Sequence, residues 1–294
     1  MVIRETTGTL GRDAFSRSGR QAGAAGGPAR FGLAMLIGLL AGSSSARPAP
    51  EPEPPRYHPL LLDCARYRTQ GRSEILVQAG RQRTHESLGR DGVMVLRAAG
   101  VDSLIQLEAW FDTLTMWREG SGERLEPDTD GLVGGRYRGT LTRQGGFTSS
   151  DTPFIPDEVA EVADLSTALA DLLPQLPPVA LAPGRSWRDG LGTVITRIDD
   201  GSVGGRIVER YRLFRRSARQ ESRFLPDSTE VSASRTEGES GIFSWSSELG
   251  VIRWERDLTD EVAVPVGGLV KQPFKTRIEQ KVTVDRVGGG GECK

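Results

Sequence analysis

Residues 275–285 read KTRIEQKVTVD, and the side chains along this stretch alternate in character. Thr276, Ile278, Gln280, Val282 and Val284 fall on one face of an extended chain, whereas charged residues dominate the other face. A strand with one solvated face is typical of an antiparallel sheet. The stretch therefore predicts a sheet that covers a core with one side and meets water with the other.

Further strand-like runs precede this stretch. We expect strands at 104–117, 132–147, 187–198, 203–216, 221–236, 242–247 and 251–264. Asp112 and Thr113 break the alternation of the first run, which predicts a β-bulge. Turns are expected at Asp199–Ser202 (DDGS) and Glu248–Gly250 (ELG). This cadence predicts a mainly β (α+β) fold, whose curved antiparallel sheet forms a half-barrel or a barrel-like structure.

The pattern changes between residues 151 and 190. Apolar residues recur there at steps of three and four, which predicts one central helix over 156–173 that ends before Pro174. The apolar positions are Val159, Val162, Leu165, Leu169, Leu172 and Leu173. Prolines 177, 178 and 183 then predict an extended crossing. The segment is either a connector that covers one end of the sheet or a lid over an apolar cavity.

The N-terminal region has the features of a targeting segment. Arginines precede the short apolar run FGLAMLIGLLAG at 31–42, and small residues suited to cleavage follow, up to Ala46. We therefore expect a signal peptide at 1–46 and export to the periplasm or the extracellular space; an uncleaved N-terminal membrane anchor is the alternative. Ser43 stands where a lipoprotein signal would carry cysteine, so lipidation is not expected.

The remaining organisation follows from composition. A proline-rich linker is expected at 47–59 and a flexible tail at 288–294. Between them, residues 60–287 are expected to form a single β-rich domain. It would consist of two meander halves, 60–150 and 185–287, joined by the helix and crossing at 151–184.

The residue types argue against most catalytic chemistry. The sequence has no G-x-S-x-G, P-loop, G-x-G-x-x-G or paired C-x-x-C motif, and its only histidines are His58 and His85. We therefore expect no enzyme activity, cofactor or metal site, although an unrecognised carboxylate pair would make a hydrolase. A net charge of −1 gives no attraction to nucleic acid.

Two sets of residues are candidates for a role. The first comprises the large side chains Trp110, Phe111, Phe243, Trp245, Trp254 and Leu169, which either fill the core or line an apolar ligand site. The second is Cys64 and Cys293, which flank the expected domain. They either form a disulfide in an oxidising compartment or stay free.

The layout also resembles a known group. A signal segment, a strand-rich half, the crossing LPPVALAPGRSW at 176–187 and a second meander resemble exported LolA/LppX-like half-barrel proteins, in particular uncharacterised bacterial members. The resemblance implies a curved antiparallel sheet that binds lipid or lipid-like groups. We expect an exported, non-enzymatic protein that binds a lipid or another apolar ligand. The alternative is a structural or protein-interaction module of the cell envelope, with a protein partner and no ligand pocket; the oligomeric state is left open.

Overall fold

A computed structural model of the chain describes residues 53–101, 103–120, 122–224, 230–265, 272–288 and 293. All the described residues belong to one unit, Pro50–Lys294. The expected targeting segment 1–46 therefore lies outside the described residues, as do residues 47–52 of the expected linker and most of the expected tail.

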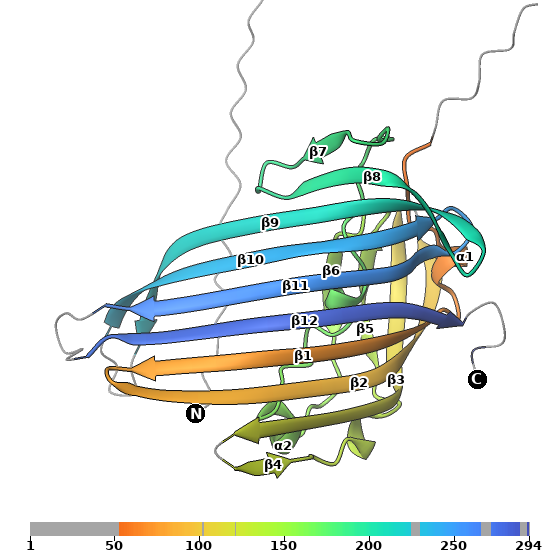
Figure 1. Cartoon of the computed structure of the whole chain (residues 1–294). Helices are drawn as coiled ribbons and strands as arrows, with labels where there is room; N and C mark the ends of the chain where they lie inside the picture. The colour runs from red at the N-terminus through yellow and green to blue at the C-terminus, as the bar shows by residue number, and fades with distance from the viewer. Residues whose placement is uncertain are drawn as a thin grey trace, which may run out of the picture. The chain divides into compact units, whose positions relative to one another are not determined.

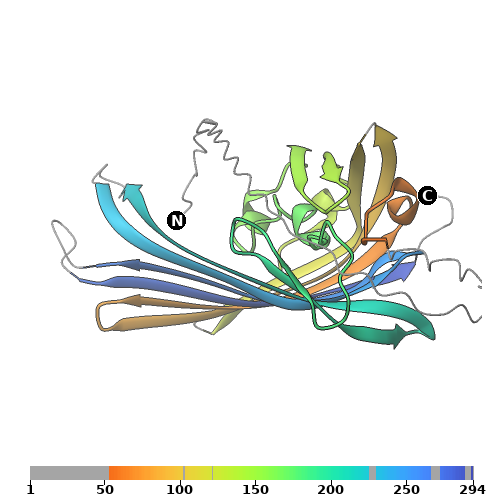
Figure 2. The same cartoon turned by 90° about the horizontal axis from the view of Figure 1, so that it is seen from above.

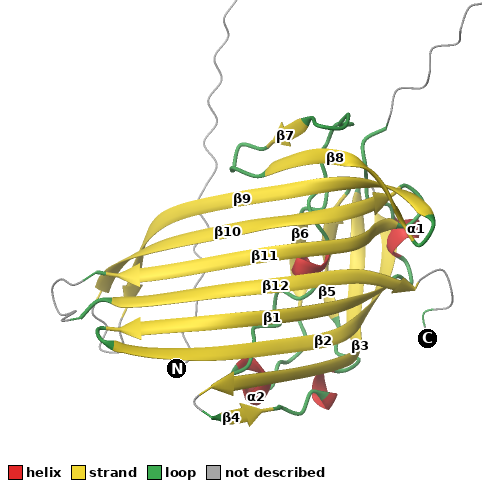
Figure 3. Cartoon of the chain, viewed as in Figure 1, coloured by secondary structure: helices red, strands yellow, loops and turns green. Residues whose placement is uncertain are grey.

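The described residues form one sheet of twelve strands with very little helix (Figures 1 and 3). The strands are β1 (Arg66–Ala79), β2 (Gln82–Val101), β3 (Leu104–Gly120), β4 (Glu123–Leu125), β5 (Tyr137–Thr142), β6 (Phe147–Asp151), β7 (Ser186–Arg188), β8 (Val194–Val203), β9 (Arg206–Phe224), β10 (Glu230–Ser246), β11 (Gly250–Val264) and β12 (Phe274–Gly288). The helical pieces are α1 (Pro59–Leu62), α2 (Asp157–Ala160), and the short 3₁₀ turns η1 (Asp130–Leu132) and η2 (Ala170–Leu172).

The strand order is β6-β5-β3-β2-β1-β12-β11-β10-β9-β8-β7, and β4 pairs with β3 off this path. Every pairing between these strands is antiparallel. The predicted mainly β class with a curved antiparallel sheet is confirmed. Because β6 and β7 are unpaired edges, the sheet is open and does not close into a barrel.

Local predictions for the strands met different outcomes. The bulge is confirmed, because Val93 pairs with Thr113 and Met94 with Phe111, so that Asp112 is skipped. The turn after Ser246 is also confirmed, since β11 begins at Gly250. The alternation in β12 is confirmed as well: Val282 and Val284 are buried and their odd-numbered neighbours are more exposed.

Two predicted strand boundaries were wrong. The expected turn at Asp199–Ser202 lies inside β8, and the chain reverses instead at Gly204 and Gly205, whose φ angles are 59° and 78°. Two successive positive φ angles suit a two-residue hairpin, and glycine adopts them without a steric penalty. The expected strand 221–236 is two strands, because β9 ends at Phe224 and β10 begins at Glu230; the residues between them lie outside the described ranges.

The segment between β6 and β7, residues 152–185, is called the crossing here, and the predicted central helix within it was wrong. Only α2 and η2 are helical, although all six predicted apolar positions are buried. One cause is local: the Asp164 carboxylate accepts a hydrogen bond from the Ser166 amide at 2.8 Å, which competes with a continuous helix. The apolar spacing therefore predicted burial correctly and helix incorrectly.

The crossing packs against one half of the concave face of the sheet (Figure 2). Its apolar side chains share a core with strands from both ends of the sheet order, including Leu141 of β5 and Leu213 of β9. Tyr57, which falls within the expected linker, joins this core: its ring meets Trp245 edge-on at 5.3 Å and its hydroxyl donates to the Pro174 carbonyl. The packed domain therefore begins before residue 60.

The far half of the long strands β1, β2 and β9–β12 has no other described segment over its concave face (Figure 2). We call these two regions the covered half and the open half. Strand register assigns to the open half the parts of these strands at residues 73–79, 82–88, 215–222, 232–239, 258–264 and 274–280.

If the crossing supplies the core of the covered half, Leu165→Ala will lower the free energy of unfolding by about 2–5 kcal/mol, because Leu165 is 0% exposed. Ser166→Ala, one residue along on the exposed side, will change it by less than about 0.5 kcal/mol. Urea unfolding followed by circular dichroism measures both. Equal effects would mean that the crossing does not pack as described.

Candidate functional site

The candidate aromatic residues do not form an open pocket. Phe111, Phe243, Trp245 and Trp254, together with Leu169 from the crossing, lie in the core of the covered half. Neighbouring side chains of the same protein fill the space around them; Tyr211, for example, stacks on Phe243 at 5.1 Å. The geometry gives these five residues a packing role.

Trp110 is separate from the other five. It follows the opposite alternation in β3 and is 7% exposed on the convex face, where the Arg136 guanidinium lies over its ring at 3.8 Å. A cation–π contact of this kind shields the ring from water. Trp110 is therefore not brought together with the other candidates.

The open half presents a different surface, which is organised in rows across six strands. The row nearest the crossing is Leu88, Ser73, Gln280, Leu258, Glu239 and Arg215, from β2 to β9. The next row is Glu86, Ile75, Ile278, Asp260, Glu237 and Ser217. In these rows β1, β12 and β11 contribute the apolar side chains of Ile75, Ile278 and Leu258, whereas Asp260, Glu237, Glu239 and Arg215 make the side toward β9 charged. The strand β2 contributes one side chain of each kind, Leu88 and Glu86.

A hollow of about 320 Å³ lies along this surface. Its lining combines the apolar side chains of Leu258 and Ile278 with charged groups such as Arg235 and Glu237. Such a mixed wall can contact an apolar chain on one side and polar groups on the other.

The charged side of the open half is largely neutralised from within. Arg235 binds Asp260 through two hydrogen bonds of 2.9 and 3.0 Å and also reaches Glu237 at 3.0 Å. Glu239, only 7% exposed, pairs with Arg215 at 3.0 Å and with Arg256 at 2.8 Å. Paired carboxylates of this kind hold the wall together and are poorly placed to act as free acids or bases.

A border row separates the two halves of the concave face. It consists of Arg90, Gly71, Val282, Arg256, Gly241 and Leu213. Arg256, 6% exposed, donates to the main-chain carbonyl of Asp171 at 3.0 Å and to its carboxylate at 3.3 Å. Because Asp171 belongs to the crossing, Arg256 ties the crossing to the sheet where the open half begins.

Polar atoms without partners collect near this border. Arg90 Nε, Arg256 Nε, Trp254 Nε1 and Tyr137 Oη are sealed from solvent and have no hydrogen-bond partner in the described part of the chain. Burial lowers the pKa of Arg90, and the nearby Arg256 adds to this effect while Asp171 opposes it. Burial also raises the pKa of Tyr137 to about 12, against the charge of Arg90.

Sequence reasoning missed these border residues, although a signal existed. In β11, Arg256 and Asp260 share the parity of Trp254 and Leu258, and so interrupt an otherwise apolar face. A charged residue at a core position is informative because burial of charge requires a partner. Arg90 gives a weaker signal, since its neighbours on β2 are mixed in character.

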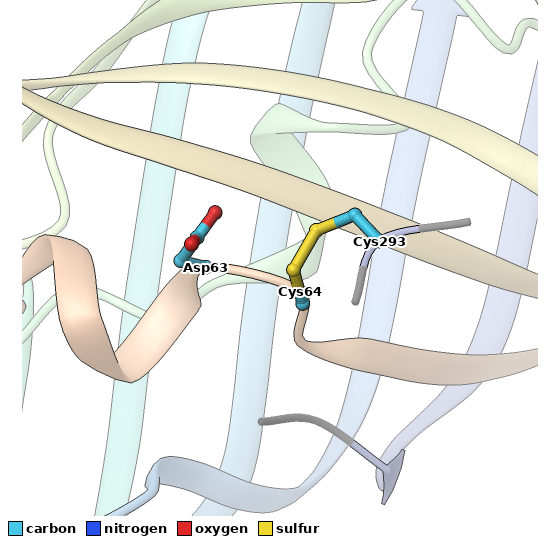
Figure 4. Close-up of side chains that lie close together, drawn as sticks. All are labelled: Asp63, Cys64 and Cys293. Carbon is cyan, nitrogen blue, oxygen red and sulfur yellow. A yellow bond between two sulfur atoms is a disulfide. The ribbon is translucent and has the colours of Figure 1, made fainter. Parts of the chain in front are cut away.

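The remaining candidates are placed plainly by the structure. His85 is exposed on β2, 3.0 Å from Glu74, and His58 is exposed before α1. Cys64 and Cys293 are joined by a disulfide with a Cα–Cα distance of 5.1 Å, close to the Asp63 carboxylate (Figure 4). Since metal binding by cysteine requires the thiolate, the disulfide removes both sulfurs as metal ligands.

Comparison with known proteins gives limited likeness. No protein-family model matches the chain, and no curated protein matches its sequence. A lipovitellin structure concerned with lipid–protein interactions is similar over 79% of this chain, with 8% identity and a TM-score of 0.43; the match spans about a quarter (26%) of the lipovitellin chain. A DUF1329 family protein from Desulfovibrio piger ATCC 29098 is similar over 78% of this chain and 88% of its own length, with 11% identity and a TM-score of 0.17.

Helices in the described ranges are all too short or too polar to cross a membrane.

The disulfide spans 229 residues of sequence, so its removal frees the ends of a long loop in the unfolded chain. Reduction with dithiothreitol will lower the free energy of unfolding by about 2–4 kcal/mol. The double variant Cys64→Ser/Cys293→Ser will match the reduced wild type and will not respond to the reductant. An oxidised wild type as unstable as the double variant would contradict a stabilising bridge.

Glu239→Gln will lower the free energy of unfolding by about 3–5 kcal/mol, because it leaves the buried Arg256 charge with only Asp171 beside it. The matched change Glu237→Gln, on the same strand and face, will cost about 0–1 kcal/mol since that pair is more exposed. Denaturant titration of the two variants and the wild type gives the comparison. A cost for Glu237→Gln equal to that for Glu239→Gln would show that burial is not the cause.

Proposed function

We propose that this is an exported, non-enzymatic protein that binds a lipid or another apolar ligand against the open half of its concave face. The observation that carries the proposal is the cross-strand pair Ile75 and Ile278, with Leu258 beside it, on a wall that no other described segment covers. When an apolar ligand covers half-buried apolar side chains on a concave surface, apolar area is removed from water, and this favours binding.

The location of the ligand differs from the one expected from the sequence. One expectation was that the large aromatic residues line the ligand site, but all of them except Trp110 pack with the crossing in the core of the covered half. The same curved sheet continues beyond this core, so the crossing occupies one half of the concavity and the other half is available to a ligand. The crossing acts as a fixed end wall in this proposal.

Export is supported by two independent features. The apolar run at 31–42 with small residues after it is typical of a signal peptide. The disulfide between Cys64 and Cys293 is compatible with a compartment outside the cytoplasm, where disulfides persist.

Binding without catalysis is supported by the chemistry of the wall. Asp260, Glu237 and Glu239 are each engaged by arginine within the sheet, and the sequence has no recognisable nucleophile motif. A second candidate is a protein-interaction module of the cell envelope. It is favoured by the packing of the candidate residues Phe111, Phe243, Trp245 and Trp254 in a core made of the protein's own side chains.

The test is uptake of a fluorescent fatty acid by the mature protein, residues 47–294, produced with export, together with native mass spectrometry and lipid analysis of an organic extract. We expect a bound lipid or saturable uptake. Ile75→Asn will weaken uptake at least about tenfold, because it replaces an apolar contact by a polar one. Leu76→Asn is the matched control, since Leu76 lies next in sequence on the opposite face of β1 and is 40% exposed.

A wild-type protein with a clean ligand-free mass and no uptake would contradict the lipid proposal and leave the interaction module. Uptake that Ile75→Asn and Leu76→Asn reduce equally would place the ligand elsewhere.

A further inference from the structure

The side chain of Arg90, on β2, extends over the neighbouring strand β1. It faces Gly71 on β1, and a Cβ added at Gly71 would come within 3.1 Å of both Cγ and Nε of Arg90. The arginine side chain therefore fills the space that the missing side chain of Gly71 leaves. This position directs Arg90 along the border row, in which Val282 and Arg256 follow Gly71.

The two arginines of the border row are satisfied unequally. Arg256 has the carboxylates of Glu239 and Asp171 within 2.8 and 3.3 Å. The Nε atoms of both arginines are sealed from solvent and lack an acceptor, but no carboxylate contacts any nitrogen of Arg90 among the described residues. Leaving a charged donor without an acceptor in a buried place is costly, and proteins seldom keep such a group without a use for it.

A second donor reaches the same part of the core. The Tyr137 ring meets Phe111 edge-on at 5.9 Å, and Phe111 lies against Gly92, two residues from Arg90 on β2. The hydroxyl of Tyr137 is also sealed and has no partner in the described part of the chain; burial raises its pKa, and the charge of Arg90 opposes this effect. Burial favours the neutral form of this phenol, so that the hydroxyl keeps its proton and can donate it in a hydrogen bond. A guanidinium and a phenol that both lack an acceptor are suited to one anionic group.

Arg90 borders the open half. Arg90 keeps part of its surface accessible, and the rows beyond it on β1 and β12 continue through Ser73 and Gln280 to Ile75 and Ile278. From Gly71 to Val77 the strand extends about 20 Å at the usual rise per residue. An apolar chain lying along the direction of β1 and β12, from Ile75 and Ile278 toward Gly71, would bring a charged head to Arg90.

We propose that Arg90, assisted by the Tyr137 hydroxyl, binds the anionic head, a carboxylate or a phosphate monoester, of an amphipathic lipid whose chain lies along Ile75 and Ile278. The inference rests on the proposed function and adds the chemical class of the ligand and its direction in the open half. It also assigns a role to a buried charge that the fold itself leaves unpaired.

The experiment compares ligands that differ only in the head. Palmitate, hexadecyl phosphate and the uncharged hexadecanol are titrated into the wild type and into Arg90→Met, with displacement of a fluorescent fatty acid as the readout. Arg90→Met removes the charge and keeps most of the side-chain volume. Arg253→Met, an exposed arginine on the convex face of β11, is the matched control.

We expect Arg90→Met to weaken palmitate and hexadecyl phosphate at least tenfold and to leave hexadecanol within twofold of the wild type. Arg253→Met will leave all three unchanged. Thermal unfolding without ligand separates this role from a structural one: Arg90→Met will melt at the same or a higher temperature than the wild type, because an unpaired buried charge is removed.

Should Arg90→Met fail to fold, Tyr137→Phe removes one donor with its ring intact, and we expect it to weaken the binding of the two anionic ligands only.

Other outcomes are decisive in different ways. Equal palmitate affinity in the wild type and Arg90→Met would overturn the assignment of Arg90 and leave the proposed function in place. No binding of either palmitate or hexadecanol to the wild type would overturn the proposed function, and this inference with it. Displacement or thermal stabilisation by inorganic phosphate or acetate as strong as that by the lipids would indicate a site for a free anion and would overturn the lipid assignment.

Discussion

The hydrophobic contact between the crossing and the concave face is the constraint on which the rest of the structure depends. An open sheet of twelve strands has one face to bury, and no second sheet is present among the described residues to cover it. The crossing supplies this cover, but it is long enough for only one half. The molecule is consequently divided into a region whose apolar surface is satisfied from within and a region where the same surface continues without cover.

Charge follows the same division. On the convex face, ion pairs such as Arg253 with Asp285 are exposed and contribute little to stability. On the concave face, the ion pair of Glu239 with Arg256 is buried at the border between the two halves. Arg256 also donates to Asp171, and this contact fixes the position of the crossing on the sheet. Arg90 lies in the same row but outside this network. The border between the two halves therefore also holds a guanidinium group that has no hydrogen-bond acceptor among the described residues.

The sequence allowed the sheet to be predicted more fully than the site. Alternation in β12 is a direct consequence of strand geometry, and the bulge at Asp112 appears as a break in that alternation, so both were visible. The spacing from Val159 to Leu173 also predicted burial. It could not show that short turns rather than a helix would deliver these residues, since the partner surface and the Asp164 hydrogen bond decide this. The sequence pattern could not show that Arg90 faces Gly71, because this contact depends on the register between β1 and β2.

The place of β12 in the sheet has a consequence for how the chain folds. The strand that comes last in the sequence lies between β1 and β11, in the middle of the strand order, and its register with β1 runs the length of both. During vectorial synthesis or translocation, β1–β3 and β9–β11 can each form local hairpins, but the seam that unites them must wait for the final strand. Until then each half presents an unpaired strand edge. Completion of the sheet is thus a late event of high contact order, and it brings Cys64 and Cys293 together only once both halves have joined.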